Sequence, residues 1–269
     1  MSANIYLHEL RARMRSVIIW SISVAAILIC FFAIFPGFAD QAALINQMMS
    51  RFPPALLEAF GMGRTNLATV VGFYSLLFGF VQLCLAIQAG NYGFGLVSIE
   101  ENELTADFLM SKPVSRLQVL TSKLLAALTS LTITNLVVWV SSFAAIALFR
   151  GKHEYEPGTL ILLLLSIVIF QLFFLAVGLV ISLLVKRVRS VTPYSLGLGF
   201  GTYVLSAFSG MFGTVALEYI TPFKHLDPAY IVQHAAYDTP LVLLNVAVSL
   251  IALGISYWLY IRRDIPAVS

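Results

Sequence analysis

Charged residues are scarce in this chain. Asp, Glu, Lys and Arg make up 11% of its 269 residues, against about 25% in an average soluble domain, whereas hydrophobic residues make up 59%. A soluble surface cannot be built from so few charges, so the composition excludes a cytosolic enzyme, a disordered tail and a nucleic-acid-binding protein. We therefore expect the chain to lie in a membrane, with lipids as its main solvent.

The few charged residues leave long gaps between them. Six charge-free stretches reach the ~20 residues that a helix needs to cross the ~30 Å hydrocarbon core of a bilayer. They are rich in Leu, Ile, Val, Phe and Ala and do not alternate as β-barrel strands do. We predict an all-α membrane protein, a single domain over residues 1–269. Its six transmembrane helices are expected at about 16–38, 66–90, 124–149, 158–185, 191–213 and 240–261.

Cysteine and histidine are also rare. Cys30 and Cys84 fall inside predicted spans, which favours small packing residues over a disulfide. The sequence from His153 to Glu156 departs from the His-Glu-x-x-His pattern of zinc peptidases. No histidine falls in a predicted span, where a serine-type intramembrane protease would need one. We therefore expect neither a metal site nor a protease.

The chain lacks a source of energy of its own. No stretch matches the nucleotide-binding pattern Gly-x-x-x-x-Gly-Lys-Ser/Thr, since the pair Gly151–Lys152 is followed by His153. None of the 16 basic and 13 acidic residues falls in a predicted span, so the carboxylate relay of an ion-driven pump is missing as well. A transporter with this sequence must take its energy from a partner, and we expect no enzyme activity and no cofactor in this chain.

Basic residues indicate the orientation, because they accumulate in short cytoplasmic loops. An even number of spans puts both termini on one side, and that side carries 11 of the 16 basic residues: Arg11, Arg13, Arg15, Lys112, Arg116, Lys123, Lys186, Arg187, Arg189, Arg262 and Arg263. Both termini are therefore predicted to be cytoplasmic. Residues 3–14 alternate charged and apolar side chains at helical spacing, which predicts an amphipathic helix on the inner leaflet. A plain basic flank to the first span is the alternative.

The longest cytoplasmic loop contains two signals for the start of a helix. Ser98 with Glu101, and Ser115 with Gln118, each match a capping box. Pro113 disfavours helix in the residue before it. The pattern predicts a short helix at about 98–111, a break, and a second helix that continues into the third span.

The short helix is predicted to be acidic with an apolar face. Leu104 and Phe108 share one face, and Glu100, Glu103 and Asp107 line a neighbouring one. Lipids of the inner leaflet are anionic and would attract a basic helix, so an acidic one is better suited to binding another protein. A solvated connector is the alternative.

The segment from Glu101 to Arg116 resembles the one after the second span in ABC-2 type permeases, where acidic residues, a Thr and a run of Leu precede Ser-x-Pro-Val-Ser-Arg. In that family it is the coupling helix, seated in a groove of a separate ABC ATPase subunit. The resemblance implies these ATPase-docking residues: Glu100, Glu101, Glu103, Leu104, Asp107, Phe108, Lys112 and Arg116. Leu104 departs from the family, since many members carry Gly there.

The same resemblance implies the type of transporter, its membrane and its partner subunits. The protein would be the permease of a bacterial ABC exporter in the cell membrane, with two ATPase subunits that bind ATP and Mg²⁺. The sequence Thr221-Pro-Phe-Lys-His-Leu-Asp-Pro228, before the last span, looks like the re-entrant region of the family.

Uncharged polar residues inside the spans are candidates for a transport pathway, because they are costly against lipid. They are Gln82, Gln88, Asn91, Asn135, Gln171, Thr202, Tyr203, Ser206 and Ser209. Hydrogen bonding between helices is the alternative for each of them. Tyr203, Ser206 and Gly210 fall on one helical face, and the family resemblance places the second and fifth spans along the path.

Small residues in the fifth span predict close packing with another helix. Gly197 and Gly201 form a Gly-x-x-x-Gly motif, and Ser206 with Gly210 repeats the spacing. The first and fifth spans form the contact between two permeases in the family, which implies a homodimer or a heterodimer with a similar permease. The cargo is expected to be amphipathic or hydrophobic, with toxic or antimicrobial peptides as the leading candidates, then drugs and lipids. A non-transporting membrane anchor or sensor for a cytosolic protein is the alternative function.

Overall fold

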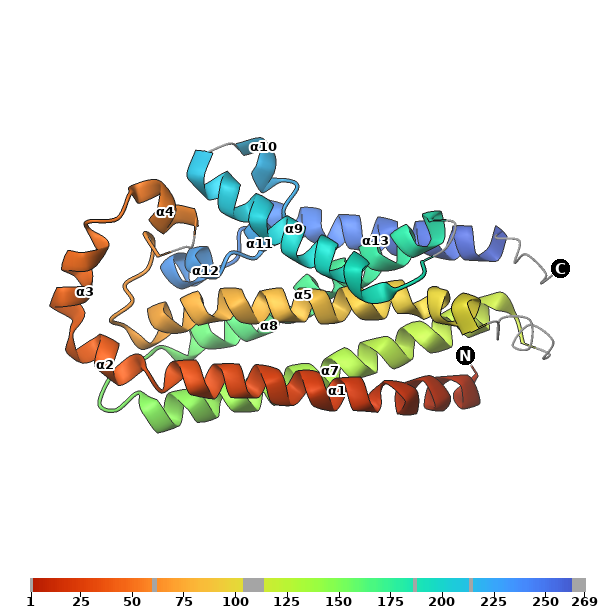
Figure 1. Cartoon of the computed structure of the whole chain (residues 1–269), viewed down its shortest axis with the longest axis horizontal. Helices are drawn as coiled ribbons and strands as arrows, with labels where there is room; N and C mark the ends of the chain where they lie inside the picture. The colour runs from red at the N-terminus through yellow and green to blue at the C-terminus, as the bar shows by residue number, and fades with distance from the viewer. Residues whose placement is uncertain (1, 60–61, 104–113, 186–187, 213–214, 263–269) are drawn as a thin grey trace.

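Six long helices form the body of the protein in a computed structural model, which describes residues 2–59, 62–103, 114–185, 188–212 and 215–262 (Figure 1). The described part contains no strand. The long helices are α1 (Ala3–Phe32), α5 (Val70–Glu103), α7 (Arg116–Phe149), α8 (Pro157–Leu184), α9 (Val191–Phe212) and α13 (Thr239–Arg262).

Six short helices of the described ranges lie together at one end of the bundle, which we call the distal end (Figure 1). Between α1 and α5 they are α2 (Phe35–Asp40), α3 (Ala42–Met49) and α4 (Pro54–Ala59). Between α9 and α13 they are α10 (Val215–Glu218), α11 (Pro222–His225) and α12 (Pro228–His234). The opposite, proximal end carries the start of α1, the end of α5, the start of α7 and the end of α13.

Five of the predicted spans are confirmed as helices long and apolar enough to cross a membrane. They are α1 together with α2, α5 as far as Ser98, α7, α8 and α13. The predicted span at 191–213 is also helical, as α9, but it is not among the five. Helix α9 contains four glycines together with Thr202 and Tyr203. The all-α membrane class is therefore confirmed, and the sixth crossing stays a prediction.

The predicted N-terminal interfacial helix is not a separate element. Helix α1 runs without interruption from Ala3 to Phe32 and packs against α7. The hydroxyls of Tyr6 and Thr129 lie 3.0 Å apart, and the backbone N–H of Ser2 donates to Ser122 Oγ at 2.8 Å. The start of α1 therefore lies against the first turns of α7, the helix that was predicted to begin after Ser115 and to continue into the third span.

The predicted helix start at Ser98 is wrong, and the one at Ser115 is confirmed. Helix α5 continues through Ser98 to Glu103, and Ser98 Oγ donates to the Phe94 carbonyl one turn back instead of capping a new helix. Ser115 Oγ accepts from the Gln118 N–H, and the Gln118 side chain accepts from the Ser115 N–H, which completes the capping box of α7. Most of the predicted coupling helix, from residue 104 on, lies outside the described residues.

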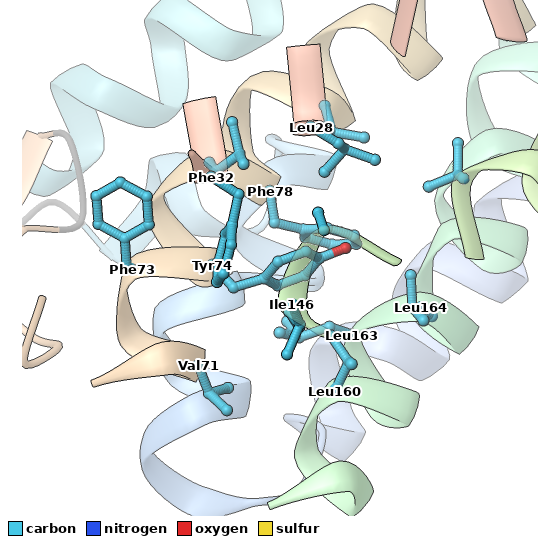
Figure 2. Close-up of a cluster of buried hydrophobic side chains, with 14 of the residues drawn as sticks. Leu28, Phe32, Val71, Phe73, Tyr74, Phe78, Ile146, Leu160, Leu163 and Leu164 are labelled. Carbon is cyan, nitrogen blue, oxygen red and sulfur yellow. The ribbon is translucent and has the colours of Figure 1, made fainter. Parts of the chain in front are cut away.

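The distal half of the core is aromatic. Figure 2 shows side chains of α1, α5, α7 and α8 converging there, among them Phe32, Tyr74 and Leu163. The rings of Phe32 and Phe35 stack at 5.2 Å, and the Tyr74 hydroxyl lies 2.7 Å from Ser142 Oγ. Tyr74 thus places its ring in the core while its polar end is bonded to α7, as a buried Tyr requires.

Helices α5 and α8 cross very closely near the middle of the bundle. A Cβ on Gly93 would lie 2.3 Å from the Leu175 carbonyl oxygen, and one on Gly178 would lie 3.2 Å from the Gly90 carbonyl oxygen. Gly199 of α9 approaches α5 in the same way, with Ile87 Cγ1 3.0 Å from its Cβ position. These glycines let the backbones of α8 and α9 pack directly on α5.

Candidate functional site

The predicted ATPase-docking segment joins α5 to α7 at the proximal end. The backbones of Glu100, Glu101 and Glu103 form the last turns of α5, and Leu104, Asp107, Phe108 and Lys112 lie outside the described residues. Arg116 is the first residue of α7, and its Nη1 donates to the Ile261 carbonyl of α13 at 3.3 Å. Both sides of the segment are therefore fixed in the bundle, and its docking role stays a prediction.

A buried group of charges joins the start of α7 to α1 and to α5 near its end. The Lys123 ammonium, on α7, is 3.2 Å from Glu9 Oε1 of α1 and donates to the Leu96 carbonyl of α5 at 2.9 Å. Glu9 Oε2 also lies 3.0 Å from Arg13 Nη2, and the Arg13 guanidinium sits 5.4 Å from the Tyr92 ring centroid. This cluster was not predicted from the sequence. The signal was available, because Glu9 and Lys123 both stand just before predicted spans that enter from the same side.

A recess of about 70 Å³ opens at the distal end between α5, α9 and the α11–α12 segment. Three of the predicted pathway residues line it: Gln82 from α5, and Tyr203 and Ser206 from α9. The structure thus brings together residues that are more than 120 positions apart in the sequence. Gln82 also donates from Nε2 to the Leu226 carbonyl at 3.0 Å, which ties α5 to the predicted re-entrant region.

The recess combines an apolar wall with a charged rim. Leu76, Phe80 and Phe223 line the wall, and Arg64, Lys224 and Asp227 lie at the rim. Asp227 Oδ2 is 3.7 Å from Arg64 Nη1 and 3.6 Å from Lys224 Nζ, while Asp227 Oδ1 accepts from the Ala229 N–H and caps α12. Both ion pairs are longer than charge-assisted hydrogen bonds.

Three other pathway candidates bond helix to helix within the bundle. Asn135 Nδ2 of α7 donates to Gln171 Oε1 of α8 at 2.8 Å, and both side chains are buried. Gln88 Nε2 of α5 donates to Thr134 Oγ1 of α7 at 2.9 Å. These amides therefore fit the alternative of interhelical hydrogen bonding.

The remaining pathway candidates are not brought to the recess either. Asn91 Oδ1 on α5 accepts from Ser195 Oγ on α9 at 2.9 Å. Thr202 Oγ1 donates to the Leu198 carbonyl of its own helix at 2.7 Å, and Ser209 is buried with no partner for its hydroxyl among the described residues. Of the nine residues, the structure gathers Gln82, Tyr203 and Ser206.

The predicted packing glycines of α9 do not face another described helix of this chain. A Cβ on Gly197 or on Gly201 would have nothing within 4 Å, whereas Gly199 between them packs on α5. Gly210 lies in the last turn of α9. The Gly-x-x-x-Gly face is thus open on the surface of the bundle.

His225 anchors the segment that closes the recess. It is 2% exposed, with Nε2 3.1 Å from the Tyr219 carbonyl and Nδ1 3.3 Å from Asn245 Nδ2 of α13. A carbonyl only accepts, so Nε2 carries the proton and Nδ1 accepts from the amide, which is the arrangement of a neutral ring. Burial lowers the pKa of His225, against smaller raising effects from the carbonyls of Tyr219 and Glu218 and the Asp238 carboxylate.

The described residues offer no metal site. No three His, Cys, Asp or Glu side chains among them come close enough to hold an ion, and Cys30 and Cys84 are free thiols.

Comparison with known proteins identifies a family relationship. A family model described as ABC-2 family transporter protein matches residues 3–265, nearly the whole chain. No curated protein and no solved structure matches it.

Proposed function

The chain belongs to the ABC-2 family of transporter proteins, and from that premise we propose that it is the permease of an ATP-driven exporter for amphipathic cargo. Its energy comes from a separate ABC ATPase subunit, present in two copies, which binds ATP and Mg²⁺. This assignment agrees with the absence of a nucleotide-binding motif in the sequence of the permease.

The proximal end is the cytoplasmic end in this proposal. Its support is the concentration of basic residues in the segments that lead into it. The start of α1 and the end of α13 lie at that same end, which requires an even number of crossings. With five apolar helices long enough to span, α9 supplies the sixth crossing, running from the proximal to the distal end. The membrane is the bacterial cell membrane.

The ATPase acts through the segment between α5 and α7. ATP-driven closure of the two ATPase subunits would displace this segment through its acidic residues, among them Glu103 and Asp107. Rigid-body motion of the attached helices then switches the pathway between inward and outward access.

The lining of the recess is the main support for the proposed transport route and cargo. An apolar wall, four uncharged polar side chains (Ser75, Gln82, Tyr203 and Ser206) and a charged rim suit a molecule that is apolar along one face and charged elsewhere, and at about 70 Å³ the recess would contact only part of it. Short amphipathic helical peptides of the toxic or antimicrobial kind have this character, and hydrophobic drugs or lipids share part of it.

The open Gly-x-x-x-Gly face of α9 supports a pair of permeases. Gly197 and Gly201 allow a second helix to approach closely, and no helix in the described part of the chain occupies that space. A second copy of this chain, or a similar permease, would complete the pathway there.

The proposal is tested in inside-out vesicles that contain the permease and its cognate ATPase. We expect ATP-dependent accumulation of a fluorescent amphipathic helical peptide, and no accumulation with an ATPase whose catalytic glutamate is replaced. If the complex hydrolyses ATP but moves neither peptides, drugs nor lipids, the anchor or sensor alternative replaces the exporter.

A further inference from the structure

The first two turns of α7 are bonded to three other long helices. Arg116 binds the end of α13, and the hydroxyls of Thr121 and Tyr257, also on α13, lie 3.1 Å apart. Ser122 accepts from the backbone of Ser2 at the start of α1. The start of α7 is therefore a polar junction, at the point where the chain returns from the segment proposed to contact the ATPase.

Lys123 is the most buried charged residue of this junction. It is 2% exposed, and its ammonium joins three helices, since it belongs to α7, pairs with Glu9 of α1 and donates to the Leu96 carbonyl of α5. Arg13 completes the charge balance by pairing with the second oxygen of Glu9. Each charge in the group thus has an opposite charge or a carbonyl within hydrogen-bonding distance.

The position of Lys123 in the chain gives this junction a mechanical consequence. Leu96 lies eight residues before residue 104, and Lys123 lies ten residues after residue 113. The bond between them joins α5 to α7 on both sides of the segment, so a relative displacement of these two helices strains the bond. Because Lys123 also pairs with Glu9, the same displacement moves α1.

A buried polar junction transmits motion differently from an apolar contact. A buried charge separated from its partners is strongly unfavourable, so this junction resists a relative shift of the helices. A buried ion pair adds little net stability compared with apolar residues of similar volume, but it holds one relative position of the helices. Lys123 therefore suits the role of fixing the register of α1, α5 and α7.

We propose that Lys123, held by Glu9 and the Leu96 carbonyl, is a positioning residue that makes α1, α5 and α7 move as one body when the ATPase displaces the segment between α5 and α7. This inference rests on the proposed function. Its distinctive consequence is that loss of the junction uncouples ATP hydrolysis from the conformational change without preventing ATP hydrolysis.

The test uses a reporter in the distal recess. Gly79 lines the recess, and a Cβ there would have nothing within 4 Å, so Gly79→Cys in a background lacking Cys30 and Cys84 adds a thiol without a clash. The permease with its cognate ATPase is placed in lipid nanodiscs. The measured quantities are the ATPase rate and the rate at which a hydrophilic maleimide labels the introduced thiol, with and without ATP and vanadate.

The decisive variant is Lys123→Met, and Lys152→Met, exposed at the distal end, is its matched control. We expect Lys123→Met to hydrolyse ATP within about twofold of the parent while the nucleotide-dependent change in labelling falls about tenfold, because the register of the helices is lost. Lys152→Met should change neither. Lys123→Arg should keep the labelling change at least in part, because it retains a buried cation whose N–H groups can donate to both Glu9 and the Leu96 carbonyl.

Three outcomes overturn the proposal. They are an unchanged labelling response in Lys123→Met, loss of ATPase binding by a folded Lys123→Met, and a folded Lys123→Arg that loses the labelling response as fully as Lys123→Met. If Lys123→Met does not fold, Lys123→Gln with Glu9→Gln replaces it, since both charges are then removed together. Absence of a nucleotide response in the parent protein would contradict the proposed function instead.

Discussion

The side-chain nitrogen of Asn135 lies 2.8 Å from Gln171 Oε1, deep between α7 and α8. Both side chains are buried, and Asn135 Oδ1 and Gln171 Nε2 have no partner among the described residues. This hydrogen bond between two side-chain amides joins α7 to α8, as does the bond that Trp139 Nε1 donates to the Leu164 carbonyl at 3.3 Å. This pair shows that a polar residue in a predicted span can hold two helices together without lining a pathway.

Replacing either partner of this pair should destabilise the bundle. Asn135→Leu leaves the Gln171 amide buried without a partner, which costs about 1–3 kcal/mol. The double replacement Asn135→Leu with Gln171→Leu should cost less than the sum of the two, by a coupling of about 0.6 kcal/mol. Unfolding in a denaturing detergent measures all three variants, and strictly additive losses would contradict the assignment.

The close crossing of α5 and α8 predicts a sharp difference between two glycines of α5. Gly93→Ala would place a methyl group 2.3 Å from the Leu175 carbonyl oxygen, so the helices must separate, at a cost of about 1–3 kcal/mol. Gly79→Ala meets nothing within 4 Å and should be neutral or slightly stabilising, because Ala favours helix. Thermal unfolding of the purified variants compares them. Equal melting temperatures would show that the crossing is not tight.

His225 predicts a pH dependence of the distal end. Its pKa is lowered in the folded protein by burial, so below the unfolded value of about 6.5 the unfolded chain binds more protons than the folded one. The stability that the neutral ring contributes is therefore present above that pH, and is lost as the pH falls from there through the lowered pKa. Melting temperatures should drop in that range.

The matched variants for this pH effect are His225→Gln and His234→Gln. The first removes the buried ring and should flatten the melting curve against pH in the acidic range. The second changes an exposed histidine of α12 and should leave the pH dependence in place. A pH profile that His225→Gln does not alter would assign the effect to another group.

The recess predicts which exposed aromatic residue contacts cargo. Phe80→Ala removes an apolar side chain from the wall without opening the core, and should weaken the apparent affinity for an amphipathic peptide by about 1.5–3 kcal/mol. Leu250→Ala, on the exposed face of α13, is the control and should leave affinity unchanged. Peptide stimulation of the ATPase rate reports the affinity. Equal affinities in the two variants would remove the recess from the pathway.

The sequence predicted elements best where a local rule decides them. The charge-free stretches gave the long helices, and the Ser115 capping box gave the start of α7. Ser98 has the same capping pattern, but α5 continues through it without a break. Its hydroxyl donates to the Phe94 carbonyl of the same helix, so it caps no new helix. A capping box alone does not tell whether the preceding helix has ended.

The site was predicted only in part, because it depends on contacts between distant residues. Helical spacing put Tyr203 and Ser206 on one face, but nothing in the spacing reveals that Gln82 of α5 lines the same recess. Glu9 and Lys123 are 114 positions apart. From the sequence each is a charge that flanks a predicted span, and only the packed helices show that they pair. Such pairings follow from the packing of α1 on α7.

The central claim is that an ATPase drives this permease through the segment between α5 and α7. The most direct test is ATP-dependent uptake of an amphipathic peptide by inside-out vesicles carrying Glu103→Arg together with Asp107→Arg. Asp40→Arg with Glu154→Arg, both exposed at the distal end, makes the same charge change as a control. We predict loss of uptake in the first variant, with normal membrane insertion, and unchanged uptake in the second. Wild-type uptake by the first variant would contradict the account.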